Sequence, residues 1–323
     1  MKAVVVHQHG GPEVLSYEDA EVPGVGPGDV LVRMQAIGVN FSDLQYRRGG
    51  YAGNLPLIPG HEGGGVIEAL GVGVSGFAAG DRVVFAGQHR RGTYKELISV
   101  PAVDLVRVPA KLDIKIAVAV LNQGRTAHYL THDAHPVEPG ERVLVHAGAG
   151  GVGSNLVQMS KQLGAYVYTT VSTPAKAGFV RGLGADEVII YTDVDFETEV
   201  QRRTEGRGVD VIFDAIGGEV LEKSLRCLAR RGHLVCYGQT GGRPARLDWP
   251  QRGLGSVYLS YHTGPDYVRS DGTGAERAAQ LFEWVENGRL KVHIHKTLPL
   301  LDAASAHREI EGRENIGKII LVP

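Results

Sequence analysis

The chain has 323 residues, which is enough for two hydrophobic cores of ordinary size. Its 34 Lys and Arg residues nearly balance 36 Asp and Glu residues, so neither a basic surface for nucleic acid nor an acidic tail is indicated. Two cysteines exclude a disulfide framework and a four-cysteine zinc site, and no apolar run reaches the roughly 18 residues of a membrane span. We therefore expect a cytoplasmic protein.

Short strands separated by Gly, Pro and Asp are predicted over about the first 120 residues. The clearest strands are 2–7, 30–37, 64–70, 81–86 and 95–100. Strands of this length and spacing are typical of a compact β-barrel-like domain. Helical spacing follows at 114–120 and 126–130, and Gly124 between them predicts two separate helices.

Strands and helices alternate from residue 142 onward. The predicted strands are 142–146, 166–171, 187–191, 210–215, 233–237 and 256–261, and the helices are 151–163, 174–183, 196–204 and 219–229. This alternation predicts a doubly wound parallel sheet. The tail (helix 274–287, strand 292–298, helix 302–311, strand 317–322) is too short for a domain of its own, so we expect it to complete the first domain. The predicted α/β domains are 1–122 with 265–323, and 123–264.

A glycine-rich turn joins the first strand and helix of that alternating region. The run Gly148-Ala149-Gly150-Gly151-Val152-Gly153 matches G-x-G-x-x-G and lies between an apolar strand and an amphipathic helix, which is the confirming context. We assign Gly148 to the tight turn, Gly150 to close approach of a pyrophosphate, and Gly153 to helix–strand packing. Residues 148–152 are therefore predicted to bind a dinucleotide at a helix N-terminus.

The end of the second strand predicts which dinucleotide is bound. NAD sites usually carry Asp or Glu there, but this strand continues into Ser172 without a carboxylate, and Lys176 follows. A hydroxyl and a lysine favour a 2′-phosphate, so we predict NADPH. Tyr191 ends the third strand and is a further candidate for the same phosphate. Gly238 and Gln239 follow a later strand and are predicted near the nicotinamide half.

Several ordered motifs together carry a family resemblance. They are Met1-Lys2-Ala3, Ala36 to Asp43 (AIGVNFSD), Ile58 to Val66 (IPGHEGGGV), His146 to Gly153 (HAGAGGVG) and Gly317 to Leu321 (GKIIL). The chain resembles the medium-chain dehydrogenase/reductase superfamily, and within it the zinc-free quinone oxidoreductase (zeta-crystallin-like) family. The resemblance implies a GroES-like β-barrel catalytic domain, a Rossmann domain that binds NADPH, and usually a homodimer. It also places Thr126 on the cofactor, and we assign Lys318 of the last motif to the cofactor site.

Zinc enzymes of the superfamily are the obvious alternative. Where they place a cysteine before the Ser-Asp pair, this chain has Asn40, and Asn122 stands near their third ligand position. His61 and Glu62 alone keep donor side chains, and a neutral amide is a poor zinc ligand. We therefore predict no metal, and the role of His61 and Glu62 stays open, a satisfied polar pair behind the site being the plain alternative.

Without a metal, hydrogen-bond donors must stabilise the acceptor oxygen as hydride arrives. The resemblance implies that Asn40 and Tyr51 line the nicotinamide pocket, so we predict both as catalytic residues and Asn40 also as a cofactor contact. Tyr46 and Gln123 are further candidates. The predicted reaction is hydride transfer from NADPH to a quinone.

Two other functions stay open. One is reduction of the C=C bond of an enone, alkenal or enoyl thioester, with Tyr51 or water as proton donor. The other is a non-enzymatic role as an NADPH-binding structural or RNA-associated protein, against which the near-neutral charge argues. The apolar strand 256–261 predicts an exposed sheet edge, through which we expect a homodimer to form.

Overall fold

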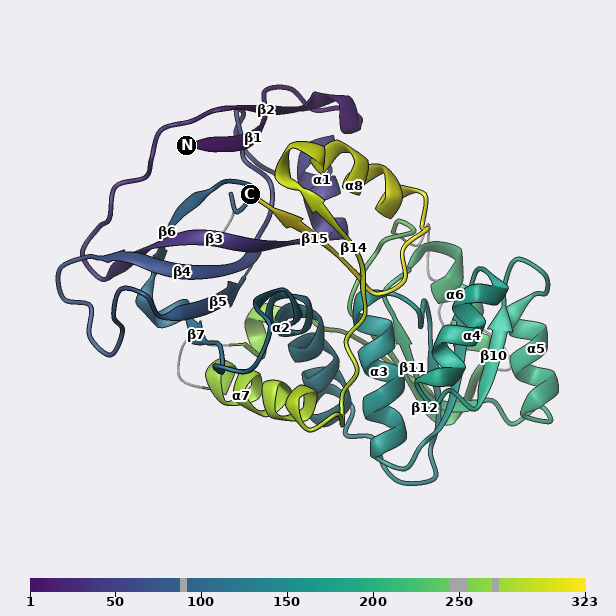
Figure 1. Cartoon of the computed structure of the whole chain (residues 1–323). Coiled ribbons are helices and arrows are strands. Elements are labelled where there is room, and N and C mark those ends of the chain that lie inside the picture. Colours follow the sequence, from purple (N-terminus) through teal and green to yellow (C-terminus); the bar gives the residue numbers. More distant parts are fainter. Residues whose placement is uncertain (88–91, 244–254, 269–272) are drawn as a thin grey trace. The chain divides into compact units, whose positions relative to one another are not determined.

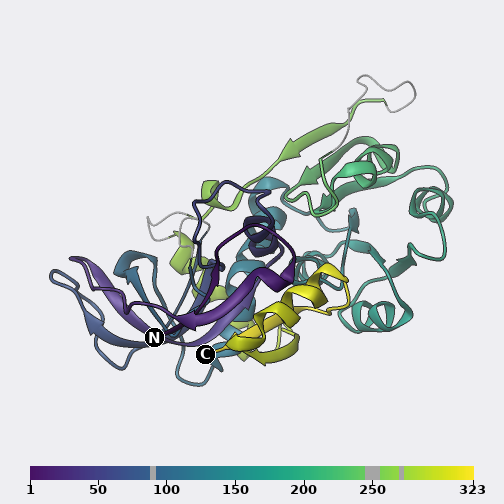
Figure 2. The ribbon, with the colours of Figure 1, turned by 90° about the horizontal axis from the view of Figure 1, so that it is seen from above.

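The computed structural model describes residues 1–87, 92–243, 255–268 and 273–323. The chain divides into two compact units. Unit 1 contains Met1–Arg125 and Val268–Pro323, and unit 2 contains Thr126–Tyr267. The domains predicted from the sequence are 1–122 with 265–323, and 123–264. Both ends of the chain belong to unit 1 (Figures 1 and 2).

Unit 1 is built on β-strands, as predicted. They are β1 (Lys2–Val6), β2 (Leu15–Asp19), β3 (Asp29–Val39), β4 (Glu62–Leu70), β5 (Arg82–Ala86), β6 (Leu97–Pro101), β7 (Val106–Arg107), β14 (Ile294–Pro299) and β15 (Lys318–Val322). The main sheet has the order β14-β15-β3-β4-β5-β7, and β6 also pairs with β3. Because β15 runs antiparallel to β3, the C-terminal tail is part of this sheet. Strand β2, which the sequence patterns missed, pairs with β1.

Helices α1 (Phe41–Arg48), α7 (Thr273–Glu286) and α8 (Ala303–Glu311) lie in unit 1, and α2 (Ile114–Tyr129) begins there. The prediction of two helices around Gly124 is wrong, because α2 continues through that residue. A Cβ at Gly124 would approach Leu281 of α7 to 3.1 Å. The glycine therefore permits close packing of two helices, which does not require a break in either.

Unit 2 is the predicted doubly wound parallel sheet. Its strands are β8 (Arg142–Val145), β9 (Tyr166–Val171), β10 (Glu187–Ile190), β11 (Val209–Asp214), β12 (Leu228–Cys236) and β13 (Tyr258–Tyr261), with the order β10-β9-β8-β11-β12-β13. Helices α3 (Gly151–Gln162), α4 (Pro174–Gly182), α5 (Phe196–Arg203) and α6 (Gly218–Arg226) connect the first five strands. This is the Rossmann strand order. Buried side chains such as Leu144, Ile189 and Leu234 form its core.

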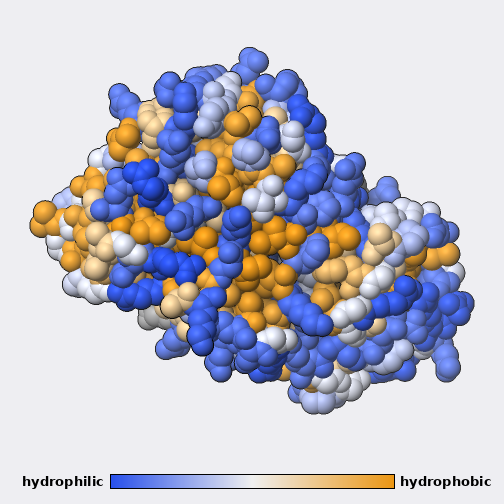
Figure 3. Space-filling model, viewed as in Figure 1, coloured by the Kyte–Doolittle hydropathy of each residue, from blue (hydrophilic) through white to orange (hydrophobic). Residues whose placement is uncertain are grey.

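The surface of unit 2 has two contrasting parts. The face around α5 and α6 is mainly hydrophilic (Figure 3) and carries ion pairs such as Glu197–Arg226 and Asp195–Lys223. Strand β13 is the outer strand of the sheet, and Tyr258 and Tyr261 on it are 57% and 60% exposed. Among the described residues, no helix has both the length and the apolar character needed to cross a bilayer.

Candidate functional site: a glycine turn and a buried polar cluster

The glycine turn links β8 to α3 in unit 2. Ala147 takes the left-handed conformation in this turn, with φ of 53°, so it makes the tight bend that we had assigned to Gly148. A Cβ at Gly148 would collide with the Thr169 hydroxyl, and one at Gly153 with the Ala147 carbonyl oxygen. A Cβ at Gly150 would meet only that carbonyl oxygen, at 3.2 Å. Packing therefore requires Gly148 and Gly153, whereas Gly150 leaves one side of the turn open.

The residues of this turn fit a dinucleotide pyrophosphate. Gly150 is the N-cap of α3, and no side chain caps the helix. The backbone N–H groups of residues 151–153 have no acceptor within the helix, because they belong to its first turn. Free amides at the positive end of a helix dipole attract an anion. The open side at Gly150 lets that anion approach the backbone.

Ser172, Lys176 and Tyr191 lie where β9 and β10 end. Tyr191 N donates to the Val171 carbonyl at 3.0 Å, so the two strand ends are joined directly before Ser172. Thr173 caps α4 by accepting from Lys176 N at 3.3 Å. The Lys176 residue is 9% exposed, whereas Tyr191 is 39% exposed. Within the sequence from Val171 to Lys176 no carboxylate is present, so the reason for expecting a 2′-phosphate stands in the folded chain.

The other predicted cofactor contacts lie on different elements. Gly238 and Gln239 follow β12, at the same carboxyl edge of the sheet as the glycine turn, and Gln239 is exposed. The idea that Thr126 begins a helix is wrong, because it lies inside α2. Its side chain is hydrogen-bonded to the Tyr129 hydroxyl. The assignment of these residues to the cofactor stays a prediction.

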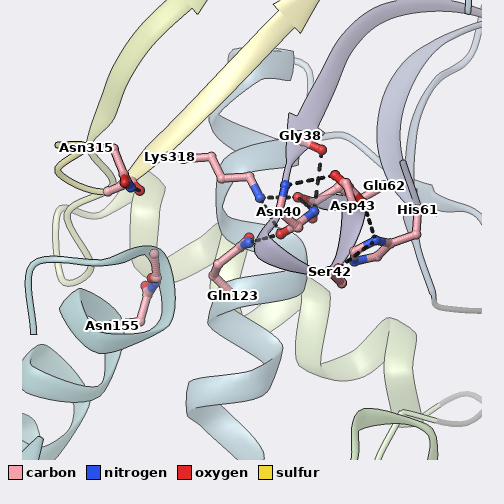
Figure 4. Close-up of polar contacts among 12 residues, drawn as sticks. Gly38, Asn40, Ser42, Asp43, His61, Glu62, Gln123, Asn155, Asn315 and Lys318 are labelled. Atoms are coloured by element: carbon pink, nitrogen blue, oxygen red, sulfur yellow. Dashed lines mark hydrogen bonds and ion pairs between the residues drawn. The ribbon is translucent and has the colours of Figure 1, made fainter. Parts of the chain in front are cut away.

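Asn40, Glu62, Gln123 and Lys318 form a polar cluster in unit 1 (Figure 4). Lys318 and Glu62 form a buried ion pair, with exposures of 3% and 1%. Asn40 Oδ1 accepts from Lys318 Nζ at 2.7 Å, and Asn40 Nδ2 donates to Glu62 Oε1 at 2.7 Å. The amide of Gln123 lies 2.8 Å from Asn40 Oδ1. Four residues distant in the sequence therefore meet around one amide.

The Asn40 amide is hydrogen-bonded through both its oxygen and its nitrogen in this cluster. Its oxygen accepts from Lys318, and its nitrogen donates to Glu62 and, at 3.4 Å, to the Gly38 carbonyl. These contacts use both hydrogens of the amide and one lone pair of its oxygen. The second oxygen of Glu62 is buried and has no hydrogen-bond partner among the described residues. Asn40 is therefore held in one orientation by the ion pair behind it.

Asp43, His61, Tyr94, Arg47 and His307 form a second buried network, next to the first. Arg47 can only donate, so His307 Nδ1 accepts from it at 3.1 Å and His307 Nε2 carries the hydrogen. His307 Nε2 then donates to the Tyr94 hydroxyl at 3.1 Å, and that hydroxyl donates to Asp43 Oδ2 at 3.2 Å. His61 Nδ1 donates to Asp43 Oδ1 at 3.1 Å. The network therefore directs its hydrogens toward Asp43.

Burial and charge act in opposite directions on this network. Burial disfavours the carboxylate of Asp43, but the hydrogen bond from His61 holds its pKa below the ordinary value. Burial disfavours the charged form of His61 as well, but the hydrogen bond to Asp43 raises its pKa above 6.5. Burial lowers the pKa of His307 to about 4. The charged forms of Asp43 and His61 therefore favour one another, whereas a pKa of about 4 leaves His307 neutral at neutral pH.

His61 and Glu62 are not the single polar pair that was considered from the sequence. His61 contacts Asp43, whereas Glu62 contacts Asn40 and Lys318, so the two side chains belong to the two different networks. The sequence shows the His-Glu pair but not these partners, because Lys318 lies more than 250 residues from Glu62. Asp43 and Lys318 were within the quoted motifs, yet their partners depend on the fold.

Tyr51, the other predicted catalytic residue, is 46% exposed. Its ring packs edge-on against Tyr46, with centroids 5.2 Å apart. The structure places this aromatic pair on and after α1, the helix that Asn40 precedes. The catalytic assignment of Tyr51 stays a prediction.

The donor set around Asn40 does not fit a catalytic zinc. Such a site needs three thiolate, imidazole or carboxylate ligands. Asn40 presents an amide whose oxygen is hydrogen-bonded to Lys318, and His61 uses Nδ1 for Asp43. Among the described residues, no group of three His, Cys, Asp or Glu side chains is arranged to hold a metal ion.

Comparisons with known proteins agree with this architecture. Residues 26–110 match the alcohol dehydrogenase GroES-like domain, and 183–321 match a family described as zinc-binding dehydrogenase. A 2-haloacrylate reductase from Burkholderia is 39% identical, with 99% of this chain and 98% of the relative covered. A quinone oxidoreductase from Pseudomonas aeruginosa is 37% identical, with 100% and 99% covered. The solved structure of Escherichia coli quinone oxidoreductase complexed with NADPH matches with a TM-score of 0.95 at 33% identity, covering both chains completely.

The sequence resemblance is thus confirmed over the full length of the chain. Both units have their counterparts in the matched families, and the relatives span nearly all of the chain. The chain is an oxidoreductase of the medium-chain dehydrogenase/reductase superfamily and belongs to its zinc-free, quinone oxidoreductase-like family.

Proposed function

We propose that the chain is an NADPH-dependent, zinc-independent reductase that transfers hydride to a quinone. The glycine turn carries this proposal, because its open side at Gly150 and its free helix amides suit a pyrophosphate. When bound, NADPH supplies the hydride. Similarity to quinone oxidoreductases, one of them solved with NADPH, supports the cofactor and the acceptor.

The chain's own residues have distinct roles in this proposal. Residues 148–152 bind the pyrophosphate, and Ser172, Lys176 and Tyr191 bind the 2′-phosphate. Thr126, Gly238 and Gln239 contact the remainder of the cofactor. In unit 1, Lys318 fixes the Asn40 amide at 2.7 Å, and we propose that Asn40 and Tyr51 border the reacting groups. Asn40 then contributes a fixed polar surface beside the reacting groups and donates no hydrogen bond to them, since both hydrogens of its amide are already donated.

Two titrations test the cofactor assignment. NADPH should bind at least tenfold more tightly than NADH in fluorescence titrations, since a charged contact to the 2′-phosphate contributes more than a kilocalorie per mole. Lys176→Met should remove most of this preference while changing NADH affinity little. Lys161→Met is a matched control, because Lys161 is paired with Asp186 at 2.8 Å. Equal affinity of the wild-type chain for the two cofactors would contradict the NADPH assignment.

The acceptor is tested by a substrate panel. NADPH oxidation should proceed with simple benzoquinones and naphthoquinones. Reduction of a C=C bond conjugated to a carbonyl or carboxylate is the second candidate, because the named substrate of the Burkholderia relative is a conjugated alkene acid. Faster turnover of enones or haloacrylates than of quinones would replace the first candidate by the second.

We also propose that two copies associate through β13. Tyr258 and Tyr261 on this outer strand are more than half exposed, and an uncovered strand edge favours pairing with its own copy. Tyr258→Lys should convert a dimer to a monomer in analytical ultracentrifugation. A monomeric wild-type chain at micromolar concentration would contradict this assembly.

A further inference from the structure

His61 is a buried histidine that the proposed cofactor and substrate contacts do not use. Its Nδ1 donates to Asp43 Oδ1 at 3.1 Å and lies 3.3 Å from Ser42 Oγ (Figure 4). Its Nε2 makes no hydrogen bond with the described residues, although 6% of the side chain stays exposed. The imidazole thus has one nitrogen fixed by a carboxylate and one nitrogen left for another partner.

Asp43 is arranged to remain an anion. It accepts from His61 and Tyr94, and its Oδ2 also accepts from the Asn40 backbone N–H at 2.9 Å. A carboxylate with three donors stays ionised even when it is fully buried. The same carboxylate joins His61 to Asn40, because its Oδ1 contacts the His61 ring and its Oδ2 contacts the Asn40 backbone N–H.

The groups that face His61 favour its charged form on balance. Burial has the largest single effect on its pKa and lowers it, as Lys318 of β15 does, whereas Asp43 of α1 and Glu62 of β4 raise it. The net result is a pKa above the ordinary 6.5. A proton on Nε2 is therefore favoured more strongly in His61 than in an ordinary histidine.

A purely structural role explains this arrangement poorly. A neutral hydrogen bond from His61 to Asp43 would join α1 to the residue before β4 equally well, and a charged pair there would add a desolvation cost that its attraction barely offsets. A histidine held by a carboxylate on one nitrogen, with the other nitrogen unpartnered among the described residues, is instead suited to giving and regaining a proton at that second nitrogen.

We propose that His61 is the general acid that protonates the acceptor oxygen, an inference that rests on the proposed reductase function. For an enone, the hydride from NADPH forms a C–H bond at the β carbon, and the displaced π electron pair moves to the carbonyl oxygen. That oxygen takes the proton from Nε2, so the N–H bond breaks as the O–H bond forms. For a quinone, hydride addition gives the hydroquinone monoanion, whose remaining oxyanion takes the same proton. The cofactor is oxidised, the acceptor is reduced, and neutral His61 regains a proton from water.

The need for an acid depends on the basicity of the oxyanion. General acid catalysis contributes roughly 10²–10⁴-fold in rate. A simple enone gives a strongly basic enolate, whereas tetrachlorobenzoquinone gives a weakly basic phenolate that is stable without a proton. His61→Gln should therefore slow enone reduction about 10²-fold or more and slow tetrachlorobenzoquinone reduction less than about tenfold.

The matched control is His7→Gln. His7 also contacts a carboxylate, Glu18, at 3.0 Å, but its side chain is 57% exposed and lies outside the site. Its removal should leave both rates unchanged. Equal losses for the two acceptors in His61→Gln, or no loss with either, would overturn the acid role. A wild-type chain that reduces neither acceptor would overturn the reductase function, and the acid role with it.

Two measurements on the wild-type chain need no variant at the site. In ¹⁵N-histidine NMR without cofactor, His61 should lose its Nε2 hydrogen at a higher pH than an ordinary histidine, because its pKa is raised. The kcat/KM for the enone should decrease as pH rises through that same pKa, while the value for tetrachlorobenzoquinone should not. A pKa of His61 below the ordinary 6.5, or identical pH profiles for both acceptors, would contradict the proposal even if His61→Gln does not fold.

Discussion

Removing the ammonium group of Lys318 tests the buried cluster around Asn40. In Lys318→Met, the Glu62 carboxylate is 1% exposed and keeps Asn40 Nδ2 as its donor at 2.7 Å, while its second oxygen already has no partner among the described residues. Breaking a buried ion pair from one side costs about 3–5 kcal/mol, because the remaining charge is uncompensated. We therefore expect Lys318→Met to lower the free energy of unfolding by this amount in urea titrations without cofactor.

Two further variants separate charge from packing. Lys2→Met removes an exposed pair with Asp19, whose side chains are 41% and 83% exposed, and should lower the free energy of unfolding far less than Lys318→Met does. The double variant Lys318→Met/Glu62→Gln removes both buried charges and should regain most of the lost stability. A loss for Lys318→Met as small as that for Lys2→Met would refute the interpretation of Glu62 as a buried, paired anion.

The remaining predictions concern the glycine turn and the His307 network. Gly153→Ala should abolish measurable NADPH binding in titrations, because the added Cβ collides with the Ala147 carbonyl oxygen. Gly178→Ala is the control, because Gly178 lies in a helix with open space around it, and this variant should bind NADPH normally. Normal NADPH binding by both variants would contradict the packing argument. The pKa of His307 is about 4 in the folded chain and about 6.5 in the unfolded chain. As pH falls from 7 to 4, the unfolded chain therefore binds a proton at this residue before the folded chain does. The free energy of unfolding should decrease by up to about 3 kcal/mol over this range. His307→Gln should flatten this part of the stability curve, and an unchanged slope would show that other groups cause it.

The alternating pattern of unit 2 was predictable because each element carries its own local signal. β8, the glycine turn and α3 follow one another within about 20 residues. The hydrophobic periodicity of each element and the glycines of the turn are therefore enough to predict them. Gly124 misled the helix prediction, because its role depends on Leu281, a residue of a distant helix. Local patterns cannot distinguish a glycine that ends a helix from one that admits a neighbour.

The polar networks of unit 1 were not predictable from local patterns. Asn40, Gln123 and Lys318 were individually noticed, but Glu62 connects to Lys318 only because β15 pairs with β3 beside β4. Likewise Tyr94 and His307 carried no signal before the fold brought them to Asp43. Sequence patterns therefore identified residue types suited to chemistry, and long-range strand pairing decided which of them act together.

Single-turnover oxidation of NADPH deuterated at the transferred position of C4 tests the central claim most directly. With the purified chain and benzoquinone in excess, we predict stoichiometric oxidation and a primary isotope effect on its rate, since the C–H bond breaks as hydride leaves. When NADH replaces NADPH at the same concentration, we predict that this oxidation is lost, because NADH lacks the 2′-phosphate that the chain contacts. Tight NADPH binding without oxidation by any quinone or enone would contradict the account and favour a non-enzymatic, cofactor-binding role.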